Sequence, residues 1–497
     1  MKLAEAMSTI TSSFETGFVK GRKPRSGIVD LKVPYKGEVL VGKELSAQVD
    51  RWIAYGTIEP SAGQAIKDVW EKKQWRDLSD RYFVLLGAGS AMGPLKLLLE
   101  LGANIVAIDL DRPKVWERLL ALADDSCGTM TFPLKEGKPQ SSLHTRDDLC
   151  EAAGANLLAH TPEILNWLKT VKPDEPLVVG SYAYLDGELH VRLSLAMDAI
   201  VKGLIETRSK VTPAYLCTPT DVHVIPEAAH AAAKKQAYSL GLTNVLCRAT
   251  CNLALSLKSN VKPPVVSTNG STFYLVDGLV SKQGPNYALA KRMQHWRAVV
   301  AREEYRCTVS SNIAPSTATA SVVSNKLFAL AYGGMKNFKP VEVFQQETSN
   351  VVMGALLLRD VNDAATPANP ILPVKNPLQL FSYGRSTAAW RMAFTMDSIG
   401  TASVLAYLLE YLLKILGCVL LLAVVVFFGV KAKDGRILDR HGGIPEERAV
   451  THARRGQVSF CRSVCDSISY VFVLDSWKSS VLGWRGRGGQ GVSSVGL

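Results

Sequence analysis

The chain has 497 residues, of which 47% are hydrophobic and 21% are charged, and this composition excludes a disordered or fibrous protein. Its length is that of roughly two or three globular domains. The formal net charge of +12 is spread along the chain and thickens only toward the C-terminus. Because no zinc-finger, homeodomain or aromatic–basic RNA-binding signature accompanies it, we expect no nucleic-acid partner. Nine cysteines without paired spacing predict reduced thiols and no metal site.

The first 75 residues are expected to form an N-terminal extension, partly helical. A polar leader is followed by a helical pattern from Lys43 to Trp75. Residues 1–20 are mixed polar and lack the apolar core of a secretory signal, so the globular part is expected in the cytosol or on another reducing side.

Residues 76–375 alternate apolar strand-like runs with helix-period segments, which predicts an α/β fold with a doubly wound, Rossmann-like parallel sheet. We expect an insertion within 120–230, and the Gly/Pro/Ser-rich segment Asp124–Arg146 is interpreted as a loop. The expected strands are Tyr82–Leu86, Ile105–Asp109, Pro176–Tyr184, Ala214–Thr218, Pro264–Thr268 and Arg306–Ile313, with helices at His190–Arg208 and Pro226–Leu240.

The most informative stretch is 82–112, where a buried strand, a glycine-rich turn, a helix and a second strand ending in acid follow one another. Glycine lets the backbone approach a pyrophosphate, and a helix N-terminus favours the negative charge. An acidic residue about 20 positions later can bond a ribose. Asp109 favours NAD, whereas Arg112 leaves NADP open. The candidate cofactor residues here are Gly87, Gly89, Ser90, Gly93, Asp109 and Arg112.

A candidate acid–base pair lies at Tyr287-Ala-Leu-Ala-Lys291. Four-residue spacing puts the phenol and the ammonium on one helix face, where the lysine is expected to lower the pKa of the phenol. A tyrosine so placed exchanges a proton with a carbonyl or an alcohol. A second match, Tyr332 to Lys336, contains two glycines that disfavour a helix, and we discount it.

The order of elements around Tyr287 resembles the short-chain dehydrogenase/reductase family. In that family a serine ends the strand before the tyrosine, and an Asn-x-x-Ala-Pro-Gly-x-x-Thr-like loop follows the next strand. This chain has Asn312-Ile-Ala-Pro-Ser-Thr-Ala-Thr319 there. The glycine turn departs from the family pattern Thr-Gly-x-x-x-Gly-x-Gly, because Leu86 replaces a threonine and Ala91 a glycine.

The resemblance implies a role for each matching residue. Tyr287 would be the general acid/base, and Lys291 would tune its pKa and contact the ribose. Ser271, or Ser267 in its place, would bond the substrate oxygen, and Asn244 would support a proton-relay water. It further implies that Pro315 and Thr317 contact the cofactor, NAD or NADP, and that the protein is a dimer or tetramer.

The C-terminal part, 376–435, is expected to be helical with a membrane anchor near 411–430. Ile415–Val430 is an uninterrupted apolar run of 16 residues. Tyr411–Leu413 extend it to the ~20 residues that span hydrocarbon, with Lys414 reaching toward a headgroup. The composition of residues 436–497 predicts a flexible basic tail.

The sequence therefore predicts a membrane-associated NAD(P)-dependent oxidoreductase that acts on a carbonyl or alcohol of a small, lipophilic substrate. One alternative is a catalytically inactive scaffold that kept the fold, which the substitution at Ala91 favours. Another is an S-adenosylmethionine-dependent methyltransferase, although Leu85 and Leu86 stand where an acidic residue usually precedes the turn. Cys217 and His223 are interpreted as a core cysteine and a surface histidine.

Overall fold

The computed structural model describes residues 3–9, 14–25, 27–238, 257–382 and 388–438. It divides into two compact units, 1–412 and 413–497, and each is described by itself. In the second unit the description covers the continuation of one helix.

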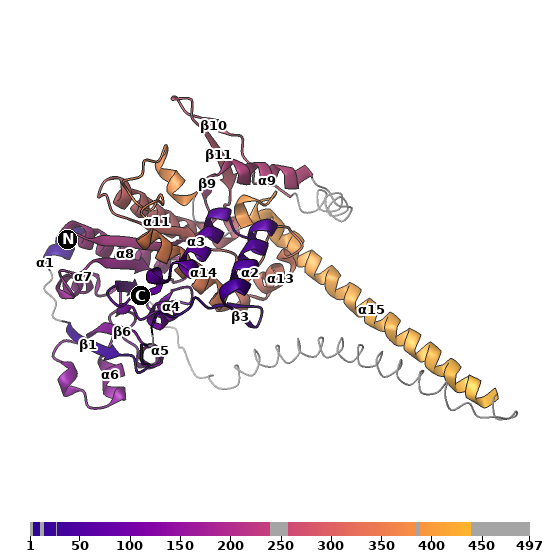
Figure 1. Ribbon diagram of the computed structural model, residues 1–497, viewed down its shortest axis with the longest axis horizontal. Coiled ribbons are helices and arrows are strands. Elements are labelled where there is room, and N and C mark those ends of the chain that lie inside the picture. The colour runs from indigo at the N-terminus through magenta and orange to yellow at the C-terminus, as the bar shows by residue number, and fades with distance from the viewer. Residues whose placement is uncertain (1–2, 10–13, 26, 239–256, 383–387, 439–497) are drawn as a thin grey trace, which may run out of the picture. The chain divides into compact units, whose positions relative to one another are not determined.

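A seven-stranded, mostly parallel sheet forms the centre of the first unit (Figure 1). Its order is β1-β6-β5-β4-β7-β8-β12, with β1 the one antiparallel strand among them. The order reverses at β4, since the chain winds outward through β5 and β6 and then returns to β7 on the other side. The strands are β1 (Glu15–Lys20), β4 (Tyr82–Leu86), β5 (Asn104–Ile108), β6 (Thr129–Leu134), β7 (Leu177–Ser181), β8 (Val211–Cys217) and β12 (Ser310–Ile313).

Both faces of this sheet are covered by helices, which is why its inner strands β4, β5 and β7 are largely apolar on both sides. In β4, Val84 and Leu86 belong to the core under α7 and α8, whereas Phe83 and Leu85 belong to the core under α4, α5 and α14. The helices are α1 (Leu3–Thr9), α2 (Gly42–Tyr55), α3 (Pro60–Glu71), α4 (Leu95–Glu100), α5 (Pro113–Asp124), α6 (Arg146–Ala152), α7 (Thr161–Thr170), α8 (Glu188–Thr207), α9 (Glu227–Tyr238), α11 (Pro285–Glu303), α12 (Ala320–Ser324), α13 (Lys326–Met335), α14 (Gln346–Asn362) and α15 (Met396–Leu438).

The loop interpretation of Asp124–Arg146 is wrong, because β6 lies inside it. Pro133 and the flanking glycines disguise this strand in the sequence. The parallel ladder with β5 ends at Thr131, so the missing N–H of Pro133 does not interrupt it, and Pro133 lies opposite Thr16 in the antiparallel pairing with β1. The polar leader supplies β1, whose Gly17 lies opposite Phe132 of β6. A Cβ at Gly17 would lie 2.4 Å from the Phe132 ring, so glycine lets that ring pack across the strand.

Five of the six expected strands are present in the central sheet, and the exception is Pro264–Thr268. It contains only β10 (Val265–Val266), which belongs to a separate three-stranded sheet with β11 (Thr272–Asp277) and β9 (Val222–Ile225). This sheet and α9 form an excursion between β8 and α11, which overlaps the expected insertion range 120–230 only at its start. Two short pairs complete the strands: β2 (Val33–Tyr35) with β3 (Glu38–Leu40), and β13 (Thr317–Ala318) with β14 (Phe344–Gln345).

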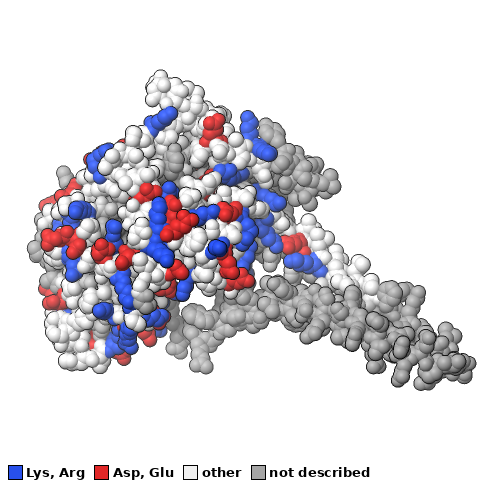
Figure 2. Space-filling view, viewed as in Figure 1, with Lys and Arg blue, Asp and Glu red and all other residues white. Residues whose placement is uncertain are grey.

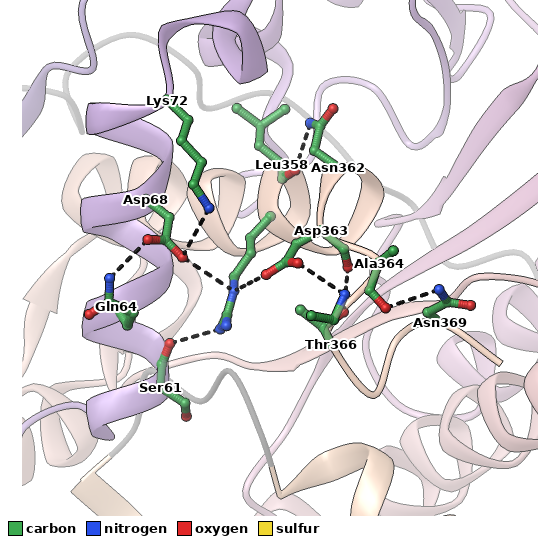
Figure 3. Close-up of polar contacts among 12 residues, drawn as sticks. Ser61, Gln64, Asp68, Lys72, Leu358, Asn362, Asp363, Ala364, Thr366 and Asn369 are labelled. Carbon is green, nitrogen blue, oxygen red and sulfur yellow. Dashed lines mark hydrogen bonds and ion pairs between the residues drawn. The ribbon is translucent and has the colours of Figure 1, made fainter. Parts of the chain in front are cut away.

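An arginine joins the N-terminal extension to the sheet layer (Figure 3). Arg359 of α14 lies between two carboxylates, with its Nε 3.9 Å from Asp68 of α3 and 3.3 Å from Asp363. Its Nη1 donates to the carbonyl of Ser61 at 3.1 Å. All three charged side chains are less than 20% exposed. The cluster therefore fixes α3 on α14 by paired, mostly buried charge.

The C-terminal helix α15 is 43 residues long, and its side chains are described as far as Val426. Met396–Val426 is apolar and long enough to cross a membrane, with a mean hydropathy of 2.4 over its best window. That window is not buried inside the structure. A C-terminal apolar helix is thus present, as the sequence predicted.

We expect Arg359→Met to lower the free energy of unfolding by about 2 kcal/mol, because Asp363 loses the arginine that pairs with it and Asp68 keeps only the more exposed Lys72 as a counter-charge. Urea unfolding in detergent measures this change. Lys96→Met is the matched control: Lys96 also pairs with a carboxylate, Glu100, but is 76% exposed, so its loss should stay within about 0.5 kcal/mol. Equal effects of the two substitutions would contradict the proposed clamp.

Candidate active site at the carboxyl edge of the sheet

The predicted tyrosine–lysine pair lies at the carboxyl end of β8. Helix α11 begins at Pro285, a residue type favoured in the first turn of a helix. Gly284 precedes it as the N-cap, with a φ of +82° that favours glycine. One helix face then carries Tyr287 and, a turn later, Lys291. Lys291 Nζ donates to the carbonyl of Leu216 at 3.1 Å, and Tyr287 Oη donates to Thr218 Oγ1 at 3.4 Å. Both side chains are therefore held at the end of the strand.

His190, in the first turn of α8, packs against this pair. Its ring is stacked on that of Tyr287, with centroids 5.8 Å apart and an angle of 22° between the planes. The Tyr184 ring lies 4.7 Å away on α8's N-terminal side. His190 is 1% exposed, and neither ring nitrogen has a hydrogen-bond partner among the described residues. The imidazole thus has an unused donor and an unused acceptor inside the site.

Burial controls the protonation of these groups. Burial, with a smaller contribution from the nearby Lys291, lowers the pKa of His190 to about 4, so His190 is neutral at physiological pH. Burial also lowers the pKa of Lys291 to about 8. The pKa of Tyr287 is raised by burial, and the hydrogen bond with Thr218 only partly opposes this. The direction is opposite to the expected effect of the lysine, so the phenol keeps its proton.

The glycine turn follows β4, beside the end of β7. Gly87 has φ of +87°, and a Cβ there would lie 2.5 Å from Ala183 Cα. Most N–H groups of the turn are already bonded: Gly87 and Ala88 donate to Ile108, and Gly89 donates to Asp109 Oδ2 at 2.6 Å. Asp109 Oδ1 accepts from Leu110 N at 2.8 Å. The acidic residue therefore fixes the turn as well as ending β5.

The turn offers fewer free backbone N–H groups to a cofactor pyrophosphate than the glycine motif predicted. Ser90 and Gly93 also donate within the turn, which leaves Ala91 and Met92 without a backbone acceptor among the described residues. These two N–H groups precede α4, which is only six residues long. Each Asp109 oxygen keeps a second lone pair for a ribose hydroxyl. The residues fit a dinucleotide at Ala91, Met92 and Asp109.

A cation lies at the turn, but it is not the predicted one. Arg118 of α5 donates from Nη2 to the carbonyl of Gly89 at 3.0 Å. Arg112 is exposed where α5 begins. Arg118 and Asp109 thus lie on the same side of Gly89, since a Cβ on Gly89 would lie 2.5 Å from Arg118 Nη2 and 3.1 Å from Asp109 Oδ2.

The turn and the tyrosine are linked through the end of β7. Ala183 lies against Gly87, and the next residue, Tyr184, has its ring 6.4 Å from that of Tyr287. The glycine turn and the tyrosine–lysine pair therefore lie on the same edge of the sheet, near the point where the strand order reverses.

The other predicted residues are not brought into this cluster by any described contact. Ser267 and Ser271 lie in the turn of the β10–β11 hairpin, where Ser267 N donates to Ser271 O at 2.9 Å (Figure 1). Thr317, on β13, donates to Pro315 O at 2.9 Å and pairs with Ser349 at 2.7 Å. Asn244 lies outside the described residues.

Sequence reasoning missed three residues: Thr218, His190 and Arg118. Thr218 ends the expected strand Ala214–Thr218, but the sequence favours Pro264–Thr268 as the strand before Tyr287, because that segment is nearer to Tyr287 along the chain. His190 starts an expected helix, and nothing in a single sequence shows that its ring reaches Tyr287. Arg118 occupies a helix position without any motif.

A second polar cluster lies further along α11, where His295 follows Lys291 by one helical turn. Asp221 is paired with Arg292 and lies 3.6 Å from His295 Nδ1. These contacts lower the pKa of Asp221. His223 is 3% exposed, so the surface interpretation of this histidine is wrong, whereas Cys217 is buried as expected. Within the described residues, no group of three or more His, Cys, Asp or Glu side chains is suited to a metal ion.

The face seen in Figure 2 mixes Lys and Arg with Asp and Glu and shows no large patch of one sign. Comparison with known proteins adds no further guide: no protein-family model, curated protein or solved structure matches the chain significantly. The assignment of the site therefore depends on its geometry.

The burial of His190 predicts a pH dependence. Folded His190 stays neutral to about pH 4, whereas the unfolded histidine has a pKa of 6.5 and binds a proton first. The unfolded state then binds more protons between these values, so stability is lost as pH falls from 6.5 to 4. His190→Gln should reduce this loss by about 2 kcal/mol in urea unfolding in detergent. The exposed His144→Gln is the control, and an unchanged pH profile in His190→Gln would contradict a neutral buried imidazole.

Proposed function

We propose that the protein is a membrane-associated NAD(P)-dependent oxidoreductase, which reduces a carbonyl or oxidises an alcohol in a small, lipophilic substrate. The observation that carries this proposal is the meeting of Tyr287, Lys291 and Thr218 at the end of β8. A phenol, an ammonium and a hydroxyl at one strand end supply a proton donor, its electrostatic partner and a substrate contact.

The arrangement of the sheet supports a dinucleotide site. The parallel order β6-β5-β4-β7-β8-β12 corresponds to the 3-2-1-4-5-6 order of Rossmann-like sheets. Ligands of such sheets lie beyond the carboxyl ends of the strands, where the order reverses. That position here is between β4 and β7, next to Gly87 and Ala183.

Within this proposal Thr218 takes the place that the family resemblance gave to Ser271. Thr218 ends the parallel strand that precedes α11 in the sheet and already bonds Tyr287, whereas Ser271 lies in a hairpin of another sheet. Its hydroxyl would bond the substrate oxygen next to the phenol. Since burial keeps the proton on Tyr287, the phenol is set up as a donor, which favours the reductive direction.

The nicotinamide supplies hydride when bound. Ala91, Met92 and Asp109 would hold its nucleotide, and Arg118 would add positive charge beside the phosphates. Lys291 keeps a mobile proton at near-neutral pH because its pKa is about 8.

One observation favours the alternative of a non-catalytic scaffold. The turn's N–H groups at Gly87, Ala88, Ser90 and Gly93 are bonded inside the chain, as they would be in a turn that never binds phosphate. The two functions differ in nucleotide binding, which can be measured directly.

We expect Tyr287→Phe to lower turnover of lipophilic ketones or aldehydes with NADH or NADPH by roughly 10²–10⁴-fold, while leaving nucleotide affinity nearly unchanged. Absorbance at 340 nm follows turnover, and fluorescence titration gives the affinity. Tyr305→Phe is the control, because Tyr305 bonds Glu206 away from the site. Binding of neither nucleotide would favour the scaffold, and binding of S-adenosylmethionine alone would favour a methyltransferase.

We further expect Thr218→Val to lower kcat by roughly 10²-fold, because it deletes one donor to the reacting oxygen. Ser271→Ala is the matched deletion of a hydroxyl and should leave kcat unchanged. The opposite result would restore the role that the resemblance assigned to Ser271.

A further inference from the structure

Helix α13 is packed against the base of the apolar helix α15. A Cβ at Gly334 would lie 1.8 Å from the carbonyl oxygen of Ser403, and one at Gly333 would lie 2.6 Å from the Tyr407 ring. The expectation that these glycines disfavour a helix is therefore wrong, since both lie in α13, where they allow close helix–helix approach. Lys336, which caps α13, pairs with Glu410 at 2.9 Å.

The ion pair between Lys336 and Glu410 lies at the start of the apolar run of α15. Twenty residues run from Tyr411 to Val430, and at 1.5 Å per residue they cover the ~30 Å of a hydrocarbon core. Glu410 immediately precedes this run, so a membrane that takes up the run has its headgroups near Glu410. A carboxylate is stable there, and its bond to Lys336 brings the end of α13 to the same level.

The other end of α13 exposes apolar side chains. Every residue from Val323 to Phe328 is exposed, with Leu327 64% and Phe328 37% exposed. Lys326 lies beside them, and Lys336 follows at the other end of the helix. Leucine and phenylalanine flanked by lysines are typical of a helix in the interface of a bilayer with anionic headgroups.

We propose that α13 is a second membrane contact, lying in the bilayer interface with Leu327 and Phe328 among the lipids. We assign the bilayer as the partner of this surface, because α13 packs directly against α15, the helix that is apolar enough to span a bilayer. The proposal depends on α15 entering the membrane and not on the chemistry of Tyr287.

Photocrosslinking of the full chain in liposomes of phosphatidylcholine with phosphatidylserine tests the contact. Benzoylphenylalanine replaces Leu327 or Phe328, and mass spectrometry detects lipid adducts after illumination. Adducts are expected at both positions and at Leu420 of α15, which is 68% exposed. The matched control is Ile371, which is 78% exposed.

Ile371 is suited to be the control because its segment lies at the opposite edge of the sheet. Ala368 accepts from Val309 at the amino end of β12, whereas α13 follows the carboxyl end. No lipid adduct is expected at Ile371. Adducts at Leu420 without adducts at Leu327 and Phe328, or protein–protein products at those two, would overturn the proposal. Absence of adducts at Leu420 would overturn it too, by removing the anchor, and would leave the reductase assays unaffected.

Discussion

The bond from Lys291 to the carbonyl of Leu216 is the contact on which the rest of the site depends. That carbonyl belongs to the penultimate residue of β8, so the bond attaches α11 to the end of the strand. A charged donor makes a strong bond to a carbonyl that has lost its water. With α11 fixed there, Tyr287, one turn earlier, has to lie over Thr218 and beside His190.

Desolvation decides the chemistry that this geometry allows. The same burial lowers the pKa of His190 and of Lys291 and raises that of Tyr287, so each group moves toward its neutral form. In water the lysine charge would dominate its neighbours. At this packed edge of the sheet the ammonium of Lys291 donates its hydrogen bonds to Leu216 and Gln294. The phenol of Tyr287 therefore stays protonated and can act as an acid.

The sequence predicts a feature when the pattern for it lies in neighbouring residues, and misses a feature that depends on contacts between distant segments. The α/β alternation, β4, β5, β7, β8 and the apolar C-terminal helix were predictable, because apolar runs and glycine turns are local. β6 was not, because a proline and flanking glycines are untypical of a strand, and the strand that lies opposite Pro133, β1, comes from the polar leader. The role of Thr218 was not either: a hairpin pair, β10–β11, stands between β8 and α11 in the sequence but outside the sheet in space.

The glycine turn sets the remaining constraint on any nucleotide. Its shape is held by Asp109, which accepts from both Gly89 and Leu110, and by Ile108, which accepts from two turn residues. A turn so fully bonded is rigid before any ligand arrives, and a rigid site loses less conformational entropy on binding. The same bonds leave few donors for phosphate, so affinity has to come from Ala91, Met92 and the charge of Arg118. A nucleotide bound here, as we propose, would therefore be held by a few preorganised contacts rather than by many N–H groups of the glycine turn.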